Sequence, residues 1–364
     1  MKIKVIGAGS IGNHLAHAAR TLGWDVTICD IDDEALDRTC NNIYPTRYGN
    51  WDDQIKLYNI NKLPNERYDM VFIGTPPDSH LEIAISSIKE SPELILIEKP
   101  ACPPSLSHAN ELIQLAKENN VQILVGYDHV VATASDLLHN IVISNDMGNI
   151  ETLDVEFREH WAGIFAAHPW LDGPWDTYLG FWERGGGAAS EHSHATNLWQ
   201  YFARILGAGK IIEVSARLEY VRDKKINYDK LAMITVRCES GLVGRIVQDV
   251  VTKPARKWAR IQGDKGYIKW ECGFESGKDS VEAAFDNGAK FYEIIEKTRP
   301  DDFIKELQHI EKVYKKNIKD SPLSINYGLD TMLVIAAAHM SSKYDRTVAI
   351  DYNKGYSNEA LSLK

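Results

Sequence analysis

The first twelve residues, MKIKVIGAGSIG, are the feature that most limits how this chain can fold. An apolar, strand-like run leads into glycines at positions 7, 9 and 12, and an amphipathic stretch follows. In this context Gly7 permits a tight turn, Gly9 lets a pyrophosphate approach the backbone, and Gly12 allows close helix packing. The helix begins with Ser10 and Ile11 and adds the positive end of its dipole. We therefore predict a dinucleotide-binding turn rather than an ordinary one.

The residue that ends the next strand-like run, Asp30, refines this prediction. It follows Gly12 by 18 residues, and its carboxylate can accept hydrogen bonds from an adenosine ribose diol. The same carboxylate would repel a 2′-phosphate, and the segment ICDIDDEAL contains neither arginine nor lysine. The sequence therefore favours NAD over NADP as the cofactor.

The pattern of apolar residues divides the chain into two parts, as its 364 residues allow. Residues 1–125 alternate short Val/Ile/Leu runs with amphipathic stretches, which predicts an α/β domain with a Rossmann-type doubly wound parallel sheet. Residues 126–364 contain longer segments of alternating polarity, which predict an α+β domain with a large, mostly antiparallel open sheet. We expect a helix near 325–345 to pack back on the first domain.

The net charge of the chain limits which classes of partner it can bind. A net charge of −10 argues against nucleic acid, since binding a polyanion requires concentrated lysine and arginine. One basic cluster departs from this trend and is either a phosphate contact or the solvated end of a strand: Lys253, Arg256, Lys257 and Arg260. We therefore expect a small-molecule substrate.

Other sequence features bear on the compartment. Five scattered cysteines without CxxC spacing predict neither a disulfide framework nor a zinc site, and we expect no metal. The chain has no long apolar run and no export signal at Met1, so we expect a cytoplasmic protein without a membrane partner.

Two further motifs stand where strands of the first domain are predicted to end. GTPPDSH, residues 74–80, includes Thr75, Pro76 and His80, and reads as a loop on the nicotinamide side or simply as a turn. ILIEKP brings Glu98 and Lys99 to a second strand end. The carboxyl ends of parallel strands are where a doubly wound sheet binds ligands, so GTPPDSH is a candidate cofactor contact.

These motifs, together with RGGGAASEHSHATNLW at residues 184–199, resemble the glucose-fructose oxidoreductase and inositol dehydrogenase family, also called Gfo/Idh/MocA. The resemblance covers nearly the whole chain. It implies that Glu98 and Lys99 contact the cofactor, that Lys99 lies beside the nicotinamide and the substrate hydroxyl, and that His194 handles the proton. Lys99 would stabilise developing alkoxide charge, and an imidazole exchanges protons near neutral pH. From the residues alone, a salt bridge at Lys99 and a core histidine at position 194 remain alternatives.

Two acidic residues near these motifs are further candidates. Many family members carry Asp four residues before the histidine, whereas this chain has Ser190 there and Glu191 three residues before His194. On one helix, Glu191 would share a face with His194 and orient it, or would only stabilise the helix N-terminus. Asp128, in GYDH, is a candidate for binding a substrate hydroxyl or a lysine ammonium.

Residues 159–182 concentrate four tryptophans in a Gly- and Pro-rich segment. Their rings could stack on a sugar or pack a subunit interface. We choose Arg158 and Trp161 as substrate-pocket residues because they lie at the end of the preceding strand.

Taken together, the sequence predicts an NAD-dependent oxidoreductase that interconverts a secondary alcohol and a ketone on a sugar, cyclitol or nucleotide sugar. An NAD-retaining glycoside hydrolase and a non-catalytic nucleotide-sensing regulator are the alternatives. The open second sheet predicts a homodimer or homotetramer.

Overall fold

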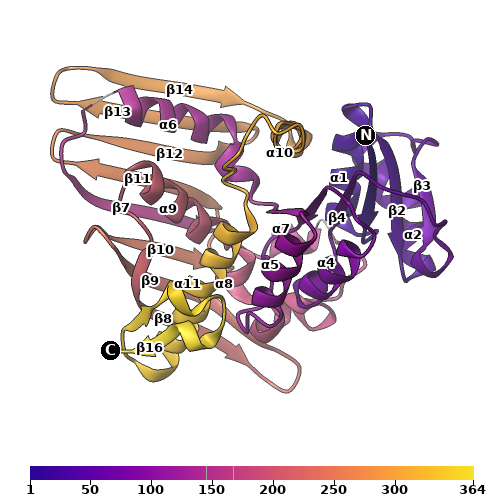
Figure 1. Ribbon diagram of the computed structural model, residues 1–364. Coiled ribbons are helices and arrows are strands. Elements are labelled where there is room, and N and C mark those ends of the chain that lie inside the picture. Colours follow the sequence, from indigo (N-terminus) through magenta and orange to yellow (C-terminus); the bar gives the residue numbers. More distant parts are fainter. Residues whose placement is uncertain (145, 167) are drawn as a thin grey trace. The chain divides into compact units, whose positions relative to one another are not determined.

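The computed structural model describes residues 1–144, 146–166 and 168–364, which form two compact units (Figure 1). Unit 1 comprises Met1–Cys102, His108–Asp128 and Arg299–Ile325. Unit 2 comprises Pro103–Ser107, His129–Thr298 and Asn326–Lys364. No helix within these residues is long and apolar enough to cross a bilayer.

Unit 1 is built on a six-stranded parallel sheet of order β3-β2-β1-β4-β5-β6. Its strands are β1 (Lys2–Ile6), β2 (Asp25–Asp30), β3 (Lys56–Asn59), β4 (Met70–Ile73), β5 (Leu94–Ile97) and β6 (Gln122–Val125). The central strands MVFI and LILI are buried throughout, as expected of a sheet covered on both faces. The order reverses beside β1, so the carboxyl ends of β1 and β4 flank the point where such sheets bind nucleotides.

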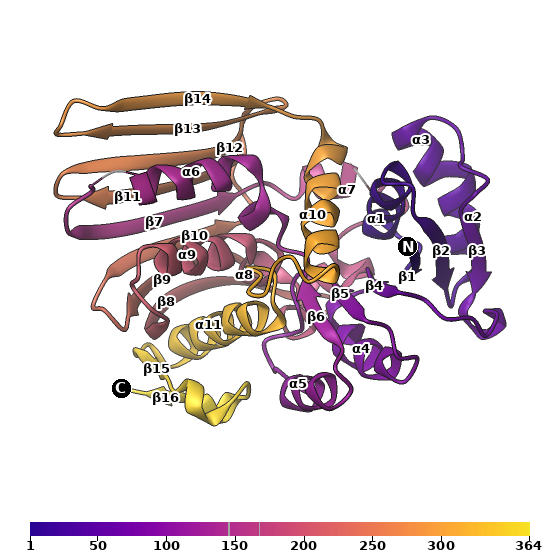
Figure 2. The same ribbon diagram turned by 45° about the horizontal axis from the view of Figure 1, so that its top comes forward.

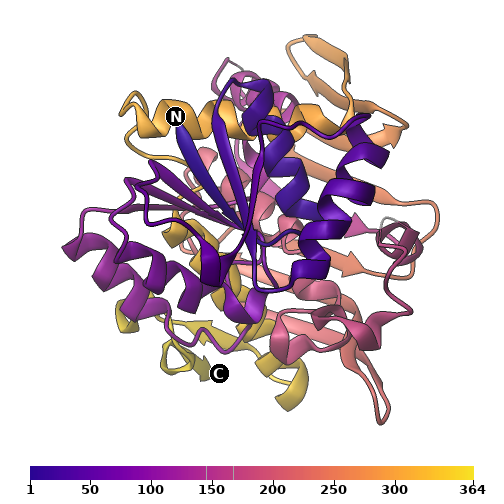
Figure 3. The same ribbon diagram turned by 90° about the vertical axis from the view of Figure 1, so that its right-hand side faces the viewer.

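Helices lie on both faces of this sheet (Figure 3). They are α1 (Ser10–Thr21), α2 (Asp33–Arg38), α3 (Tyr44–Tyr48), α4 (His80–Ile88), α5 (Ala109–Glu118) and α10 (Arg299–Tyr314). The sixth, α10, comes from late in the chain and packs against α1, where the rings of His14 and Phe303 stack with centroids 4.6 Å apart. The Rossmann-type doubly wound sheet predicted from the sequence is confirmed.

Unit 2 is built on a ten-stranded sheet of order β14-β13-β12-β11-β7-β10-β9-β8-β15-β16. Its strands are β7 (Ile150–Arg158), β8 (Ile211–Arg222), β9 (Asn227–Cys238), β10 (Val243–Asp249), β11 (Arg256–Gly263), β12 (Gly266–Glu275), β13 (Lys278–Phe285), β14 (Lys290–Glu296), β15 (Val348–Ile350) and β16 (Leu361–Leu363). Among the named strands of this sheet, β7 and β10 form the parallel pair and the other pairs are antiparallel. The predicted α+β domain with a mostly antiparallel open sheet is confirmed.

Three long helices of unit 2 cover one face of this sheet (Figure 2). They are α6 (Thr133–Ser144), α9 (His194–Ile205) and α11 (Ile325–Tyr344), while the shorter α7 (Ala162–Ala166) and α8 (Gly187–Glu191) lie in the connections. Ile234 of β9 pairs with Ala216 of β8 and is buried, whereas the preceding residue, Met233, is exposed. Successive side chains of a strand point to opposite faces, so Met233 points to the face opposite the helices.

The helix expected near 325–345 to return to the first domain differs in the structure. The returning segment is Arg299–Ile325, which carries α10, whereas α11 belongs to unit 2. The hydroxyls of Ser341 and Ser342 on α11 each accept a hydrogen bond at 2.9 Å from a backbone N–H of β8. These bonds and its buried apolar faces hold α11 on the second sheet.

Candidate active site

The glycine turn after β1 has the geometry that a dinucleotide requires. Gly7 has φ of +107°, and a Cβ there would meet the carbonyl oxygen of Gly74 at 2.8 Å. A Cβ on Gly12 would lie 1.9 Å from the carbonyl oxygen of Gly7. At Gly9 a Cβ would find no described atom within 4 Å, so this position faces open space. Two glycines are thus required by packing, and Gly9 leaves room for a ligand.

The N-terminus of α1 is available to an anion. Gly9 is its N-cap, and no described side chain caps the helix. Its first N–H groups, beginning with those of Ser10 and Ile11, therefore point toward the open space at Gly9. The turn, the space and the helix dipole together fit a diphosphate.

Asp30 lies at the end of β2, where the sequence placed a ribose contact. Its Oδ2 accepts the backbone N–H of Ala8 at 2.7 Å, and its Oδ1 accepts that of Asp32 at 3.0 Å. These bonds hold the carboxylate beside the glycine turn and leave lone pairs for ribose hydroxyls. The nearest following cation, Arg38, interacts with Asp32 and Glu34, which supports a site for NAD rather than for a 2′-phosphate.

The loop after β4 leads to His80, which the sequence predicted as a cofactor contact and which is buried in the structure. Thr75 and Pro76 lie at the strand end, and the Thr75 hydroxyl is 2.8 Å from that of Ser79. The His80 ring is fully buried, with its nitrogens 2.7 Å from the Thr75 carbonyl oxygen and 3.0 Å from that of Pro100. Burial lowers the pKa of His80 to about 4, so the neutral ring can donate to one of these carbonyls at a time. His80 therefore ties two loops together, and its ring is buried away from solvent.

The EKP motif follows β5 at the carboxyl edge of the same sheet. The Glu98 side chain is buried beside Gly126, where a Cβ would meet its Oε1 at 2.9 Å. Its Oε2 accepts the backbone N–H of Lys99 at 3.3 Å. Burial raises the pKa of Glu98 to about 8, against the opposing effect of the Lys99 ammonium. Lys99 thus stands next to a carboxyl group that retains its proton near neutral pH.

A second buried acid, Glu306 on α10, was not anticipated from the sequence. It is 1% exposed, and burial raises its pKa well above the ordinary value, with further contributions from Glu98 and Asp128. The available signal was its position on the apolar face of a helix, between Phe303 and Ile310. Glu98, Asp128 and Glu306 form a cluster of acids in unit 1 near the end of β5.

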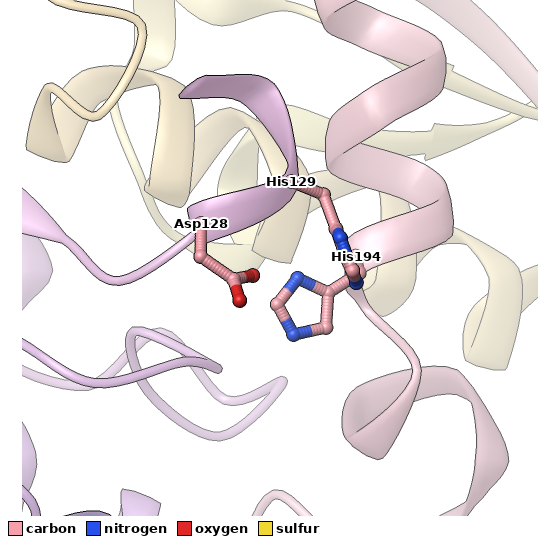
Figure 4. Close-up of side chains that lie close together, drawn as sticks. All are labelled: Asp128, His129 and His194. Carbon is pink, nitrogen blue, oxygen red and sulfur yellow. The ribbon is translucent and has the colours of Figure 1, made fainter. Parts of the chain in front are cut away.

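His194 begins α9 and has a second imidazole beside it. The rings of His129 and His194 have centroids 4.7 Å apart and planes inclined by 70°. His129 follows Asp128 in one 3-10 turn, and a side-chain oxygen or nitrogen of each of these three residues lies within 4.8 Å of the others (Figure 4). Two imidazoles and a carboxylate can relay a proton or hold a divalent metal ion. The sequence predicted no metal, and no sequence pattern marked His129 as a site residue.

The prediction that one helix carries both Glu191 and His194 is wrong. Glu191 ends α8, His194 starts α9, and His192 and Ser193 separate the two helices. The buried Gln248 side chain donates hydrogen bonds to the carbonyls of Ala189 and His192, which stabilises the break. The premise that a three-residue spacing puts Glu191 and His194 on one helix face therefore fails.

The glycine-rich segment before α8 is shaped by Asp229, a residue of β9. Gly187 has φ of +78°, and a Cβ there would meet Asp229 Oδ1 at 2.0 Å. Asp229 Oδ2 accepts the backbone N–H of Ala189 at 2.7 Å. Burial raises the pKa of Asp229 to about 7, although its backbone hydrogen bonds oppose this effect. Asp229 caps α8 and thereby positions the segment that leads to His194.

The two residues chosen for the substrate pocket lie at the end of β7 but differ in availability. Arg158 Nε donates to Asp249 Oδ2 at 2.6 Å, and the Arg158 side chain remains 33% exposed. Trp161 is 6% exposed and packs in a cluster with Leu179, Ala188 and Val250. Trp161 thus belongs to the core of this segment and presents no open ring face, because apolar neighbours cover it.

Comparisons with known proteins agree with this geometry. Residues 1–127 match the model of an oxidoreductase family with an NAD-binding Rossmann fold, GFO_IDH_MocA, and residues 136–269 match a C-terminal domain model of that family. Glucose-6-phosphate 3-dehydrogenase of Bacillus subtilis is 24% identical over 173 residues, which cover 47% of this chain and 46% of that protein. The matches span less than half the length of the curated relatives.

Solved structures match over almost the whole chain. An oxidoreductase from Agrobacterium radiobacter in complex with NAD+, L-tartaric acid and magnesium is 20% identical, with a TM-score of 0.74, and the match covers 96% of this chain and 98% of that one. Levoglucosan dehydrogenase in complex with NADH is 18% identical, with a TM-score of 0.77 and coverage of 96% and 99%. These likenesses establish a shared fold.

Proposed function

Because the chain belongs to the Gfo/Idh/MocA family of NAD-binding oxidoreductases, we propose that it interconverts a secondary alcohol and a ketone on a sugar, cyclitol or nucleotide sugar. The observation that carries the proposal is Lys99, which follows a buried strand at the carboxyl edge of a sheet whose glycine turn fits a dinucleotide. Two relatives bear the names of carbohydrate dehydrogenases, which supports a carbohydrate substrate.

The glycine turn, the first N–H groups of α1 and Asp30 would hold the cofactor, with Thr75 and Pro76 on the nicotinamide side. NAD, when bound, supplies the carbon that accepts a hydride from the alcohol. Lys99 orients the substrate oxygen and stabilises the negative charge that develops on it. His194 takes the hydroxyl proton, so that one hydride and one proton leave the alcohol and a ketone remains.

The proposal assigns supporting roles to the groups near His194. His129 and Asp128 would orient the imidazole or carry its proton onward, and Asp128 or Arg158 would bind a further substrate hydroxyl. Glu191 would act on His194 across the break between α8 and α9. The mechanism requires Lys99 of unit 1 and His194 of unit 2 to reach one substrate.

The test is a panel of sugars, cyclitols and nucleotide sugars, followed by the absorbance of reduced nicotinamide. We expect one substrate class to give stoichiometric NADH, and Lys99→Ala to lower kcat by about 10²-fold or more. The control is Lys117→Ala, which changes an exposed lysine on α5 of the same unit.

Two outcomes would contradict the proposal. Glycoside cleavage without net NADH would identify a hydrolase that recycles its cofactor. NADH binding with no turnover on any substrate class, or turnover unaffected by Lys99→Ala, would remove the proposed role of Lys99.

A further inference from the structure

Two helices of unit 1 that are far apart in sequence, α1 and α10, lie side by side. The His14 ring on α1 stacks on the Phe303 ring of α10 with an interplanar angle of 6°. At the other end of α10, the Tyr314 hydroxyl donates to Glu93 Oε1 at 3.5 Å, at the residue before β5. The C-terminal end of α10 is therefore at the amino edge of the parallel sheet, and its N-terminal end lies toward the carboxyl edge.

This direction places Arg299 near the cofactor turn. Arg299 is one helical turn before Phe303, and its guanidinium lies 5.3 Å from the centre of that ring. Ser10 is likewise one turn before His14, and α1 also starts at the carboxyl edge. Because Phe303 lies on His14 and the helices run in the same direction, Arg299 lies beside the first turn of α1.

A second guanidinium reaches the same turn from α3. Arg47 Nη1 donates a hydrogen bond to the carbonyl oxygen of Ser10 at 2.9 Å. The adjacent Tyr48 contacts His14 through its hydroxyl, and its ring stacks on His17 with centroids 3.6 Å apart. These contacts fasten α3 to α1 and leave Arg47 half-buried at the helix start.

The pKa of Arg47 indicates that the guanidinium of Arg299 is nearby. Burial lowers the pKa of Arg47, and the neighbouring Arg299 lowers it further while Tyr48 opposes the change. Arg299 also acts on Glu98, at the end of β5. Within the described residues no carboxylate forms an ion pair with Arg299, although Asp301 and Asp302 lie in the same helical turn. Like charges are thus brought together in a chain of net charge −10.

We propose that Arg47 and Arg299 bind the diphosphate of the dinucleotide, together with the N-terminus of α1. A diphosphate carries the negative charge that two converging guanidiniums require, and guanidinium–phosphate hydrogen bonds are among the stronger ones in proteins. Arg299 acts electrostatically both on Arg47, which binds the first turn of α1, and on Glu98 after β5, so it is close to both sides of the expected diphosphate site. In this way α10 supplies a cofactor ligand that the first 125 residues lack.

The experiment measures NADH binding without substrate, by fluorescence titration at several NaCl concentrations. We expect Arg299→Met to raise the Kd for NADH about tenfold at low salt and to make binding less dependent on salt. ADP-ribose keeps the diphosphate but lacks nicotinamide. Its Kd should rise in Arg299→Met, relative to the wild type, by the same factor as the Kd for NADH. Arg217→Met is the matched control, since Arg217 is an exposed arginine of unit 2.

Arg47 needs two variants because its side chain also holds the α1 backbone. Arg47→Met should weaken NADH binding as Arg299→Met does. Arg47→Lys keeps the positive charge and should bind NADH more tightly than Arg47→Met, and it serves as the test if Arg47→Met is misfolded. A Kd within twofold of the wild type for Arg299→Met, with unchanged salt dependence, would overturn the proposal. So would a loss of thermal stability in Arg299→Met with NADH affinity weakened equally at all salt concentrations. These results concern binding alone, so they stand apart from the test of the dehydrogenase activity.

Discussion

At the scale of single residues, the glycines of the first turn divide into two kinds. Gly7 and Gly12 are confined by neighbouring backbone, whereas Gly9 faces open space and has φ of −86°, which any residue can adopt. The shape of the turn therefore depends on the first two, and access to the turn depends on Gly9.

Gly9→Ala should fold normally and bind NADH weakly. The added methyl group meets no described protein atom but occupies the space in front of α1, so we expect the Kd to rise about tenfold or more. Fluorescence titration and thermal unfolding check this. Gly12→Ala is the contrasting variant, because its Cβ would clash with the Gly7 carbonyl, and it should lose stability. Equal unfolding temperatures for the two variants would contradict the distinction.

His194 lies in a group that could also hold a metal ion, so its proposed role as a base needs a direct test. We expect His194→Gln to lower kcat by about 10²-fold or more while dialysis of the wild type against EDTA leaves kcat unchanged. Steady-state kinetics before and after dialysis measure both effects. Loss of activity on chelation, with recovery on adding zinc, would instead make Asp128, His129 and His194 metal ligands.

At the scale of elements, the break between α8 and α9 is maintained by side chains from the sheet of unit 2. Asp229 of β9 caps α8, and Gln248 of β10 donates hydrogen bonds to one carbonyl of α8 and to one within the break. Both side chains are buried, so the segment that carries His194 is held by polar contacts within the fold.

The raised pKa of Asp229 predicts how this element responds to pH. Its folded-state pKa of about 7 lies above the ordinary value of 3.8, so the native state binds more protons and stability falls as pH rises from about 4 to 7. Asp229→Asn does not titrate and keeps an acceptor for the Ala189 N–H. We expect its melting temperature, relative to wild type, to increase by roughly 5 °C between pH 5 and pH 8. Thermal unfolding at both pH values checks this, and a pH-independent difference would contradict it.

At the scale of the whole molecule, the face of the second sheet opposite the helices is rich in charge. Arg245 forms ion pairs through Nε with Asp154 Oδ2 at 3.1 Å and through Nη2 with Glu156 Oε1 at 3.2 Å. Lys269 forms ion pairs with Glu271 and Glu282. Among these charges Met233 is 51% exposed. An assembly through this face, as predicted from the open sheet, would be polar and sensitive to salt.

Light scattering after size-exclusion chromatography tests that assembly. We expect the wild type to be a dimer or tetramer and Met233→Glu to shift it toward smaller species, because a buried carboxylate would face the acids of this surface. Ile143→Glu is the control, since Ile143 is an exposed apolar residue on α6. A monomeric wild type, or an unchanged mass for Met233→Glu, would contradict an interface at this face.

The sequence by itself determined the features that depend on local order along the chain. The glycine turn, Asp30, and Lys99 after a buried strand each follow from a strand, turn and helix within a few tens of residues. The two sheet types follow in the same way from runs and alternation of apolar residues. Patterns of this kind survive folding because the interactions that set them are between near neighbours in sequence.

Only the tertiary structure decided what elements from distant parts of the chain do to one another. Glu306 and Arg299 reach the first unit because α10 packs on α1, and the helix expected to carry Glu191 and His194 is broken where Gln248 binds its carbonyls. His80 and Trp161 were assigned to cofactor and substrate from their places at strand ends, and only the packed structure shows that both side chains are buried. Burial and long-range hydrogen bonding are properties of the packed chain, so no local pattern of residues predicts them.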